Sequence, residues 1–436
     1  MPVFGPVKEG PAQRAREGGR PRRATSGVAG AGNETIGGTF SALPIWQAKL
    51  AMMAACTAPG VLIRLSGVHI PAVLGILVFG GAVMAAAFML ASAAEAAELD
   101  VSPGVAVAGV AFVAVLPEYA IEVYFAFTAH VEYVTASLTG ATRLLLGAAV
   151  GMPALASFVL VRRGKPRVET VELAPQRRID LAIIAAASLY APMIVLRGHL
   201  AWTDALVLLG LYALYARRLA TGSPEPPHLI GIAAELGKLP TRQRRRWVVG
   251  VMAFAACCVL VTAEPFAQSV LLTGTAVGVS PYLLVQWLVP LATEMPELVV
   301  AFVLVTHQRA GQAVAVLLSS AVMQWTFALG TLPLAYMAGA GQGPLPLLGR
   351  EMVEVLLTMS QALFAVAVLV TLRLTRRDAV LTLALYALQL AMPTPVVRAG
   401  LAVAYLVLAW DILSSERWAI PTLARALRAR PADRSG

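Results

Sequence analysis

A proline followed by a glutamate occurs twice in this chain, each time in the middle of an apolar stretch of membrane-spanning length. Pro117-Glu118 lies in LPEYAIEV, and Pro296-Glu297 lies in ATEMPELVVAF. A carboxylate at mid-membrane depth is costly, at roughly 2.5–3.5 kcal/mol for Asp on insertion scales, and usually has a function there. The adjacent proline frees a backbone carbonyl and bends the helix. We predict that Glu118 and Glu297 face each other and bind a cation or protons.

Further oxygen-bearing side chains lie near these two glutamates in the predicted helices. Glu122 follows Glu118 by one helical turn, and Thr293 and Glu294 lie within one turn of Glu297. Small polar residues occupy the next span of each half: Ser137, Thr139, Gly140 and Thr142 in one, and Ser319, Ser320 and Gln324 in the other. Such oxygens suit Na⁺, Ca²⁺ or protons, so we predict ion-binding roles for Glu118, Glu122, Ser137, Thr293, Glu294, Glu297, Ser320 and Gln324.

The alternative interpretation of these residues is structural. The glutamates could be neutral and hydrogen-bonded within the helix packing, although their repetition at equivalent places argues against this. Ser and Thr in membrane helices more often donate to their own backbone. We take Glu118 and Glu297 as the metal ligands and the hydroxyl groups as weaker candidates.

A basic residue also lies in the middle of a predicted span. Arg143 follows Gly140 by three residues. A guanidinium at that depth requires a carboxylate partner, so we predict contact with Glu118, Glu122, Glu294 or Glu297. The functional interpretation is gating or a fixed counter-charge at the ion site, and the alternative is a structural ion pair or a span boundary that lies elsewhere.

The composition indicates a polytopic α-helical membrane protein. Hydrophobic residues make up 58% of the 436 residues and charged residues only 13%, whereas soluble domains carry about 25% charged residues. The apolar runs reach about 20 residues and do not alternate, which excludes a β-barrel. The net charge of +10 comes from basic residues between the runs, as membrane topology requires, so no nucleic-acid partner is implied.

Twelve membrane spans are predicted, with both termini on the cytoplasmic side. The expected spans are 46–66, 70–97, 103–130, 132–161, 179–197, 201–218, 247–272, 280–306, 311–338, 350–372, 378–396 and 398–415. This arrangement puts 29 Lys and Arg residues at the inside, Arg143 in the middle of a span, and four residues at the outside: Arg64, Arg197, Arg350 and Arg398. Cytoplasmic segments carry such an excess of positive charge.

The two halves of the chain repeat each other. TDALVLLGLYAL at 203–214 matches RDAVLTLALYAL at 377–388 at seven of twelve positions, and Ser102-Pro103 and Ser280-Pro281 precede the two Pro-Glu pairs. A unit of five spans is odd, so its two copies must lie inverted across the membrane. The predicted organisation is a disordered basic tail (1–45), an extra span (46–69), repeat 1 (70–218), a cytoplasmic linker (219–246), repeat 2 (247–396), an extra span (397–415) and a tail (416–436).

These motifs resemble the membrane region of sodium/calcium exchangers, in the calcium/cation antiporter superfamily. In that family a Ser-Pro turn precedes a helix with a Gly-Thr-Ser-Leu-Pro-Glu type motif, and the next helix carries asparagines. The resemblance covers about residues 70–396 and implies an all-α fold of two inverted five-helix repeats with Glu118 and Glu297 as ion ligands. Here Val113-Ala114-Val115 and Ala292-Thr293-Glu294 replace the residues before the two Leu/Met-Pro-Glu triplets, and Asn33 is the sole asparagine.

The sequence therefore predicts a secondary antiporter that exchanges a cation for Na⁺ or H⁺ by alternating access, in the cell membrane. The fewer ligands and the added Arg143 favour proton coupling. The alternative is a non-transporting scaffold or partner-binding protein that retains the exchanger fold. No HExxH, nucleophile elbow, P-loop or CxxC motif is present, so no enzyme and no cofactor other than the transported cation is expected. The expected partners are lipid and monovalent or divalent cations; the sequence gives no oligomeric state.

Overall fold

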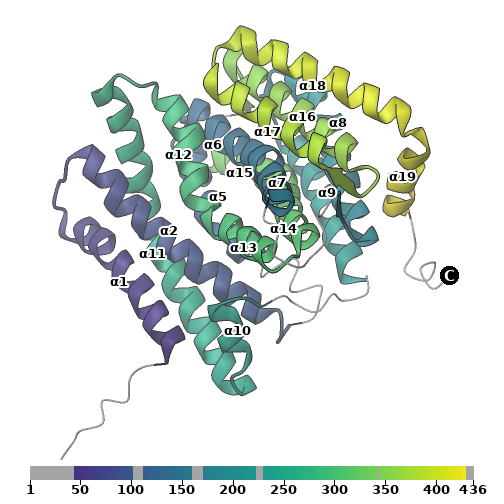
Figure 1. The fold of residues 1–436 in the computed structure, drawn as a ribbon. Helices are drawn as coiled ribbons and strands as arrows, with labels where there is room; N and C mark the ends of the chain where they lie inside the picture. Colours follow the sequence, from purple (N-terminus) through teal and green to yellow (C-terminus); the bar gives the residue numbers. More distant parts are fainter. Residues whose placement is uncertain (1–43, 102–110, 160–169, 222–228, 341–342, 429–436) are drawn as a thin grey trace, which may run out of the picture. The chain divides into compact units, whose positions relative to one another are not determined.

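The computed structural model describes residues 44–101, 111–159, 170–221, 229–340 and 343–428, all within the unit Pro44–Gly436. The predicted N-terminal tail and the turn at Ser102-Pro103 lie outside these residues. Figure 1 shows a bundle of helices that continues through the described chain, with only short strands between them. The expected all-helical polytopic fold is confirmed.

Each of the twelve predicted spans coincides with one helix or with consecutive helices. The helices that fall on the spans are α1 (Ile45–Ser66), α2 (Ala72–Ala97), α4 (Ala111–Ala114) with α5 (Leu116–Phe127), α6 (Val131–Arg143) with η2 (Leu144–Ala149) and α7 (Val150–Val159), α8 (Arg178–Arg197), α9 (Trp202–Ala220), α11 (Thr241–Val277), α12 (Pro281–Thr293) with α13 (Met295–Thr306), α14 (Ala310–Met323) with η4 (Gln324–Ala328) and α15 (Leu329–Ala340), α16 (Gly349–Leu369), α17 (Arg376–Ala391) and α18 (Pro395–Ser415). The shorter elements are η3 (Pro175–Arg177), α10 (Ile232–Gly237), η5 (Arg417–Ala419) and α19 (Ile420–Arg428).

Eight helices of the described chain are long and apolar enough to cross a membrane, or nine if α12 and α13 count as one bent span. Two others fall short for visible reasons. α17 has only 16 residues, and α9 carries Asp204 near one end and Arg217 and Arg218 at the other. The count of twelve spans therefore stays a prediction.

The two halves share an interruption that the sequence did not reveal. The third span of each half contains a short π-helix, η2 after Arg143 and η4 beginning at Gln324. The two start 180 residues apart, close to the offset of 179 between the Pro-Glu pairs. Single π-helical turns occur frequently at functional sites because they shift the helix face that follows.

Two small antiparallel sheets join the halves to each other. Strand β1 (Thr170–Glu172) pairs with β4 (Arg373–Thr375), and β2 (His199–Leu200) pairs with β3 (Leu345–Pro346). β1 and β3 precede the fourth span of their halves, and β2 and β4 precede the fifth. Each sheet therefore contains one strand from each half, and exchanging the halves turns one sheet into the other, as a two-fold relation between repeats requires.

The segments that match in sequence also begin in the same way. Asp204 accepts a hydrogen bond from the backbone N–H of Ala201 at 2.7 Å, at the start of α9. Asp378 accepts one from the backbone N–H of Thr375 at 2.9 Å, at the start of α17. A carboxylate at the third helical position satisfies a free N–H of the first turn, which explains why the aspartate recurs.

Helix packing brings helices of the two halves into close contact. α2 packs along α11, and α1 lies against α2, with an Ala-rich core between them. α6 and α12 approach so closely at Gly140 that a Cβ there would overlap the carbonyl oxygen of Gln286. Small residues at such crossings allow the backbones of two membrane helices to meet.

Candidate functional site

The second span of each half is broken at its Pro-Glu pair, as the sequence predicts. α12 and α13 meet at an angle of 55°, and α4 ends at Ala114 just before α5 begins at Leu116. Pro117 and Pro296 occupy the first turn of the second helix in each case. Proline is tolerated there because the first-turn N–H groups have no partner within the helix. Glu118 and Glu297 consequently lie in the first turn after each break.

Four carboxyl groups gather at these breaks. Glu118 is 3% exposed, Glu122 is fully buried, and Glu294 is 1% exposed. Glu118 lies within electrostatic range of Glu122, Glu294 and Glu297, and its carboxyl is within hydrogen-bond reach of Glu294. We call Glu118, Glu122, Glu294 and Glu297 the glutamate cluster. The structure thus places the two predicted metal ligands, from different halves of the chain, in one site.

Within the part of the chain that the structure describes, no basic side chain neutralises the glutamate cluster. Among the described residues, none of its four members forms an ion pair. At least one buried oxygen of each lacks a hydrogen-bond donor, and Glu122 lacks one on both oxygens. Carboxylates buried this close together repel one another strongly unless protons or a cation neutralise them.

The predicted weaker ligands behave differently from one another. The Gln324 amide donates to Glu294 at 3.5 Å, and the Ser137 hydroxyl lies beside Glu122 without the geometry of a hydrogen bond. The Thr293 hydroxyl donates to the Val289 carbonyl at 3.1 Å, as in the structural interpretation.

The two serines of α14 lie apart from these contacts. Ser320 is half-buried and makes no hydrogen bond to the described residues. Its neighbour Ser319 donates at 3.4 Å to Asp180, which also accepts from Tyr215, away from the cluster. Roles for the predicted ligands as a set therefore stay a proposal.

The predicted contact of Arg143 with the glutamate cluster is wrong. Arg143 forms an ion pair with Glu354 of α16 at 2.7 Å, and its Nε donates to the Thr139 carbonyl at 3.1 Å. Six residues at about 100° each place Arg143 about 120° around the helix from Ser137, which faces the cluster. The guanidinium therefore points to a different side of α6.

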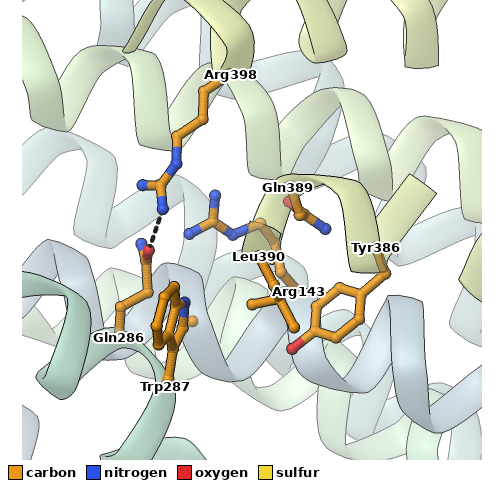
Figure 2. Close-up of a pocket in the computed structure, with 8 residues that line it drawn as sticks. Arg143, Gln286, Trp287, Tyr386, Gln389, Leu390 and Arg398 are labelled. Carbon is orange, nitrogen blue, oxygen red and sulfur yellow. Dashed lines mark hydrogen bonds between the residues drawn. The ribbon is translucent and has the colours of Figure 1, made fainter. Parts of the chain in front are cut away.

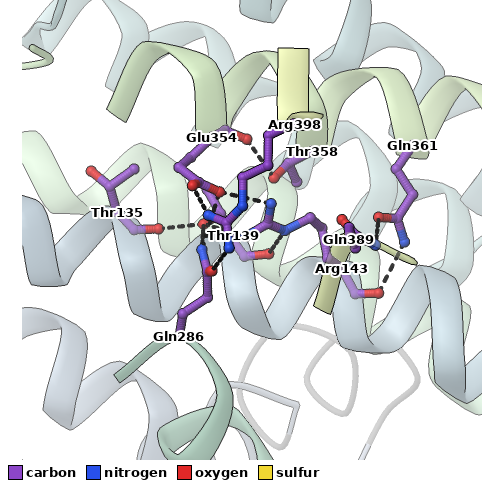
Figure 3. A network of polar contacts seen from close by, with 9 residues as sticks. All are labelled: Thr135, Thr139, Arg143, Gln286, Glu354, Thr358, Gln361, Gln389 and Arg398. Atoms are coloured by element: carbon purple, nitrogen blue, oxygen red, sulfur yellow. Dashed lines mark hydrogen bonds and ion pairs between the residues drawn. The ribbon is translucent and has the colours of Figure 1, made fainter. Parts of the chain in front are cut away.

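Glu354 is a buried glutamate that the sequence reasoning missed. It is 1% exposed and pairs with both Arg143 and Arg398, and it accepts from the Gln286 amide at 3.1 Å. Figure 3 shows these side chains meeting from four helices: α6, α12, α16 and α18. Arg398 was counted as an outside residue because it lies near a span end, yet it is only 2% exposed.

Glu95 is the second missed glutamate. It is the single charged residue in the 26 residues of α2, which was a readable signal. It lies within electrostatic range of Glu297 on one side and of Glu98 on the other, and its carboxyl is close to the backbone of Ile230. A row of nearby carboxylates therefore continues from the glutamate cluster through Glu95 towards the end of α2 and the segment that joins the two halves.

The carboxylates of the described chain do not form a ready-made metal cage. No group of three or more His, Cys, Asp or Glu side chains within these residues is arranged to hold a metal ion. A cation in the glutamate cluster would consequently be bound by fewer than three carboxylates. Carbonyl oxygens or water would complete its coordination shell, as hard cations accept.

Comparisons with known proteins match this arrangement. The sequence profile of the family described as sodium/calcium exchanger protein matches twice, over residues 71–219 and 247–394. The chain belongs to the sodium/calcium exchanger family. This family consists of transporters and not enzymes, and its transported ions are substrates, with no cofactor. The two matched stretches each contain one Pro-Glu break, so both halves of the glutamate cluster lie within the family's own region.

Solved structures of exchangers and antiporters are also similar to this chain. The crystal structure of an H⁺/Ca²⁺ exchanger, CAX, is 36% identical, with a TM-score of 0.84 over 88% of this chain and 98% of that one. The Ca²⁺/H⁺ antiporter protein YfkE shares the fold at 15% identity, with a TM-score of 0.57 over 82% of this chain and 99% of its own. The sodium-calcium exchanger NCX_Mj matches at 18% identity and a TM-score of 0.50, over 74% and 98%. No curated protein sequence matches the chain.

Proposed function

We propose that this exchanger-family protein is an antiporter that exchanges Ca²⁺ for protons through the glutamate cluster. The observation that carries the proposal is the grouping of three buried glutamates, Glu118, Glu122 and Glu294, with the half-buried Glu297, without a basic partner among the described residues. Charge balance requires protons or cations at such a site. A divalent ion that binds between two carboxyls can replace the two protons that neutralised them, which couples the two fluxes in opposite directions.

The ion choice rests on two further observations. The 36% identity to an H⁺/Ca²⁺ exchanger over 88% of the chain favours this pair of ions over sodium and calcium. Arg143 no longer supports proton coupling, because it is engaged by Glu354. The coupling is instead assigned to the mutual repulsion of the glutamates, which favours one or more protons whenever the cation has left.

The route of the ions follows from the helix breaks. Glu118 and Glu297 lie at the breaks of α4–α5 and α12–α13, and the freed carbonyls before each proline can complete a cation shell. Alternating access would then expose this site to one side of the membrane at a time, as in other inverted-repeat transporters. The Arg-rich segments between spans support placing both termini in the cytoplasm of a cell-membrane protein.

Flux in reconstituted vesicles tests the proposal. A pH gradient, acid inside, should drive Ca²⁺ uptake against its own gradient, and an ionophore that dissipates the pH gradient should stop it. Sodium gradients of equal size should give no uptake. Proton-independent, sodium-driven uptake would overturn the ion assignment, and no flux for any cation in folded protein would favour the non-transporting scaffold.

Glu297→Gln separates the role of the glutamate cluster from folding. Glutamine keeps the shape but neither releases a proton nor neutralises a metal, so uptake should fall to the level of protein-free vesicles. Glu132→Gln is the matched control, because Glu132 is exposed in the first turn of α6 and should transport normally. Equal uptake by Glu297→Gln and the wild type would remove Glu297 from the mechanism.

A further inference from the structure

A second buried polar region lies beside a different face of α6 from the glutamate cluster. Its net charge is positive, whereas the ionised glutamates are negative. Its charged members are Arg143, Arg398 and Glu354, with exposed fractions of 4%, 2% and 1%. Arg350 and Glu351 lie at its edge and cancel each other in charge. Two guanidiniums that share one carboxylate leave an excess of one positive charge. We call these three residues the arginine cluster.

A small cavity opens between the two guanidiniums. Its volume is about 10 Å³, room for a single water-sized species. Figure 2 shows Arg143 and Arg398 facing each other across it, with Trp287 and Tyr386 lining the remaining wall. The other lining residues are Gly140, Gln286, Gln389 and Leu390. No acidic side chain is among the described residues that line the cavity, and Glu354 pairs with the Nη1 atoms of both guanidiniums.

Hydrogen-bond donors at the cavity have no partner. Arg398 donates from Nη2 to the Gln286 amide oxygen at 2.7 Å and pairs through Nη1 with Glu354, yet its buried Nε–H has no acceptor. The indole N–H of Trp287 is also buried without an acceptor. Leaving a buried donor unsatisfied costs about 1–3 kcal/mol, and more for a charged group. An acceptor in the cavity that both residues line would supply a partner that these donors lack.

We propose that this cavity binds a small monovalent anion of chloride size, between Arg143, Arg398 and Trp287. An anion accepts from the free N–H groups and cancels the excess positive charge, whereas a water molecule does only the first. A cation is excluded, because two guanidiniums face the space. The bound ion would join α6, α12 and α18, and α18 lies outside the two matched family stretches.

The test is thermal unfolding of the purified full chain in detergent, titrated with sodium chloride while sodium gluconate holds the ionic strength constant. Chloride should raise the midpoint with a saturable dependence, because a ligand that binds only the folded state stabilises it by mass action. Bromide should do the same, and crystals grown in bromide should show an anomalous peak in the cavity. Identical curves in chloride and gluconate, or no peak, would mean that water fills the cavity and would overturn the proposal.

Trp287→Phe assigns the effect to this cavity. The variant keeps the ring but removes the N–H, so it should raise the half-saturating chloride concentration about tenfold, as expected for one lost hydrogen bond. Trp410→Phe is the matched control, because Trp410 is 76% exposed on α18, and its titration should be that of the wild type. An unchanged chloride dependence in Trp287→Phe would place any anion elsewhere and reject the site. None of these measurements depends on transport.

Discussion

The glutamate cluster and the arginine cluster lie beside two different faces of helix α6. Their buried charges are compensated in different ways. The first contains four carboxyls and no basic group, so its charge must be balanced by something that comes and goes. The second contains two guanidiniums around Glu354 with amides from Gln286, Gln361 and Gln389 nearby. Glu354 balances one of its two positive charges. The comparison indicates that buried charged side chains mark a functional site only where the chain supplies no partner of opposite charge.

The largest expected effect comes from removing one charge from each cluster in turn and comparing the stability of the two variants. Glu354→Gln leaves two buried guanidiniums without their carboxylate, and breaking a buried pair in this way costs about 3–5 kcal/mol. We expect a large loss of thermal stability in detergent. Glu122→Gln is the matched control, because it removes a charge from a cluster of like charges, and its stability should equal or exceed that of the wild type. A Glu354→Gln protein as stable as Glu122→Gln would show that the arginine cluster is not balanced by Glu354.

The sequence predicted the glutamate cluster well because its signal is local. A proline beside a glutamate determines a helix break within one turn, and repetition of the pair relates the two halves. The partner of Arg143 was not predictable in the same way, since Glu354 is 211 residues away in the sequence. Helix geometry also separates Arg143 from Ser137, which lies beside Glu122. Six residues along a helix do not return to the same face.

The remaining surprises have similar causes. Arg398 looked like an end-of-span residue, and only the packing of α18 against α16 buries it beside Glu354. Glu95 was a lone charge in an apolar helix, a local signal that was visible and overlooked. The π-helices and the two sheets depend on contacts between halves, which no single stretch of sequence contains.

A substitution between the two clusters sharpens the comparison. Gly140→Ala places a methyl group against the Gln286 carbonyl where α6 crosses α12. Forcing extra volume into a packed contact costs about 1–3 kcal/mol, so thermal stability should fall, and the cavity of the arginine cluster should be disturbed with it. Gly210→Ala is the control, because a Cβ at Gly210 meets nothing within 4 Å. It should leave stability unchanged or raise it slightly, as Ala favours helix over Gly.

Equal stability of the two alanine variants would contradict the close approach of α6 and α12. In that case the two clusters would not share a fixed helix pair, and Gly140→Ala would leave chloride dependence and cation flux as they are in the wild type. A stability loss with altered chloride dependence but normal flux would show that the two faces of α6 act separately.

The smallest effect concerns a third kind of ion pair, at the end of α2 beyond the buried clusters. Asp100 accepts two hydrogen bonds from Arg244, both at 2.7 Å, and these bonds hold the pKa of Asp100 below its usual value. A carboxyl whose pKa is lower in the folded state contributes stability above its unfolded pKa of about 3.9. That contribution is lost as the pH falls through the folded pKa. Asp100→Asn should therefore lower the unfolding midpoint modestly and by a constant amount at pH 5–8, and the difference from the wild type should shrink below about pH 4. A difference that grows on acidification would mean that Arg244 does not hold Asp100 as a carboxylate.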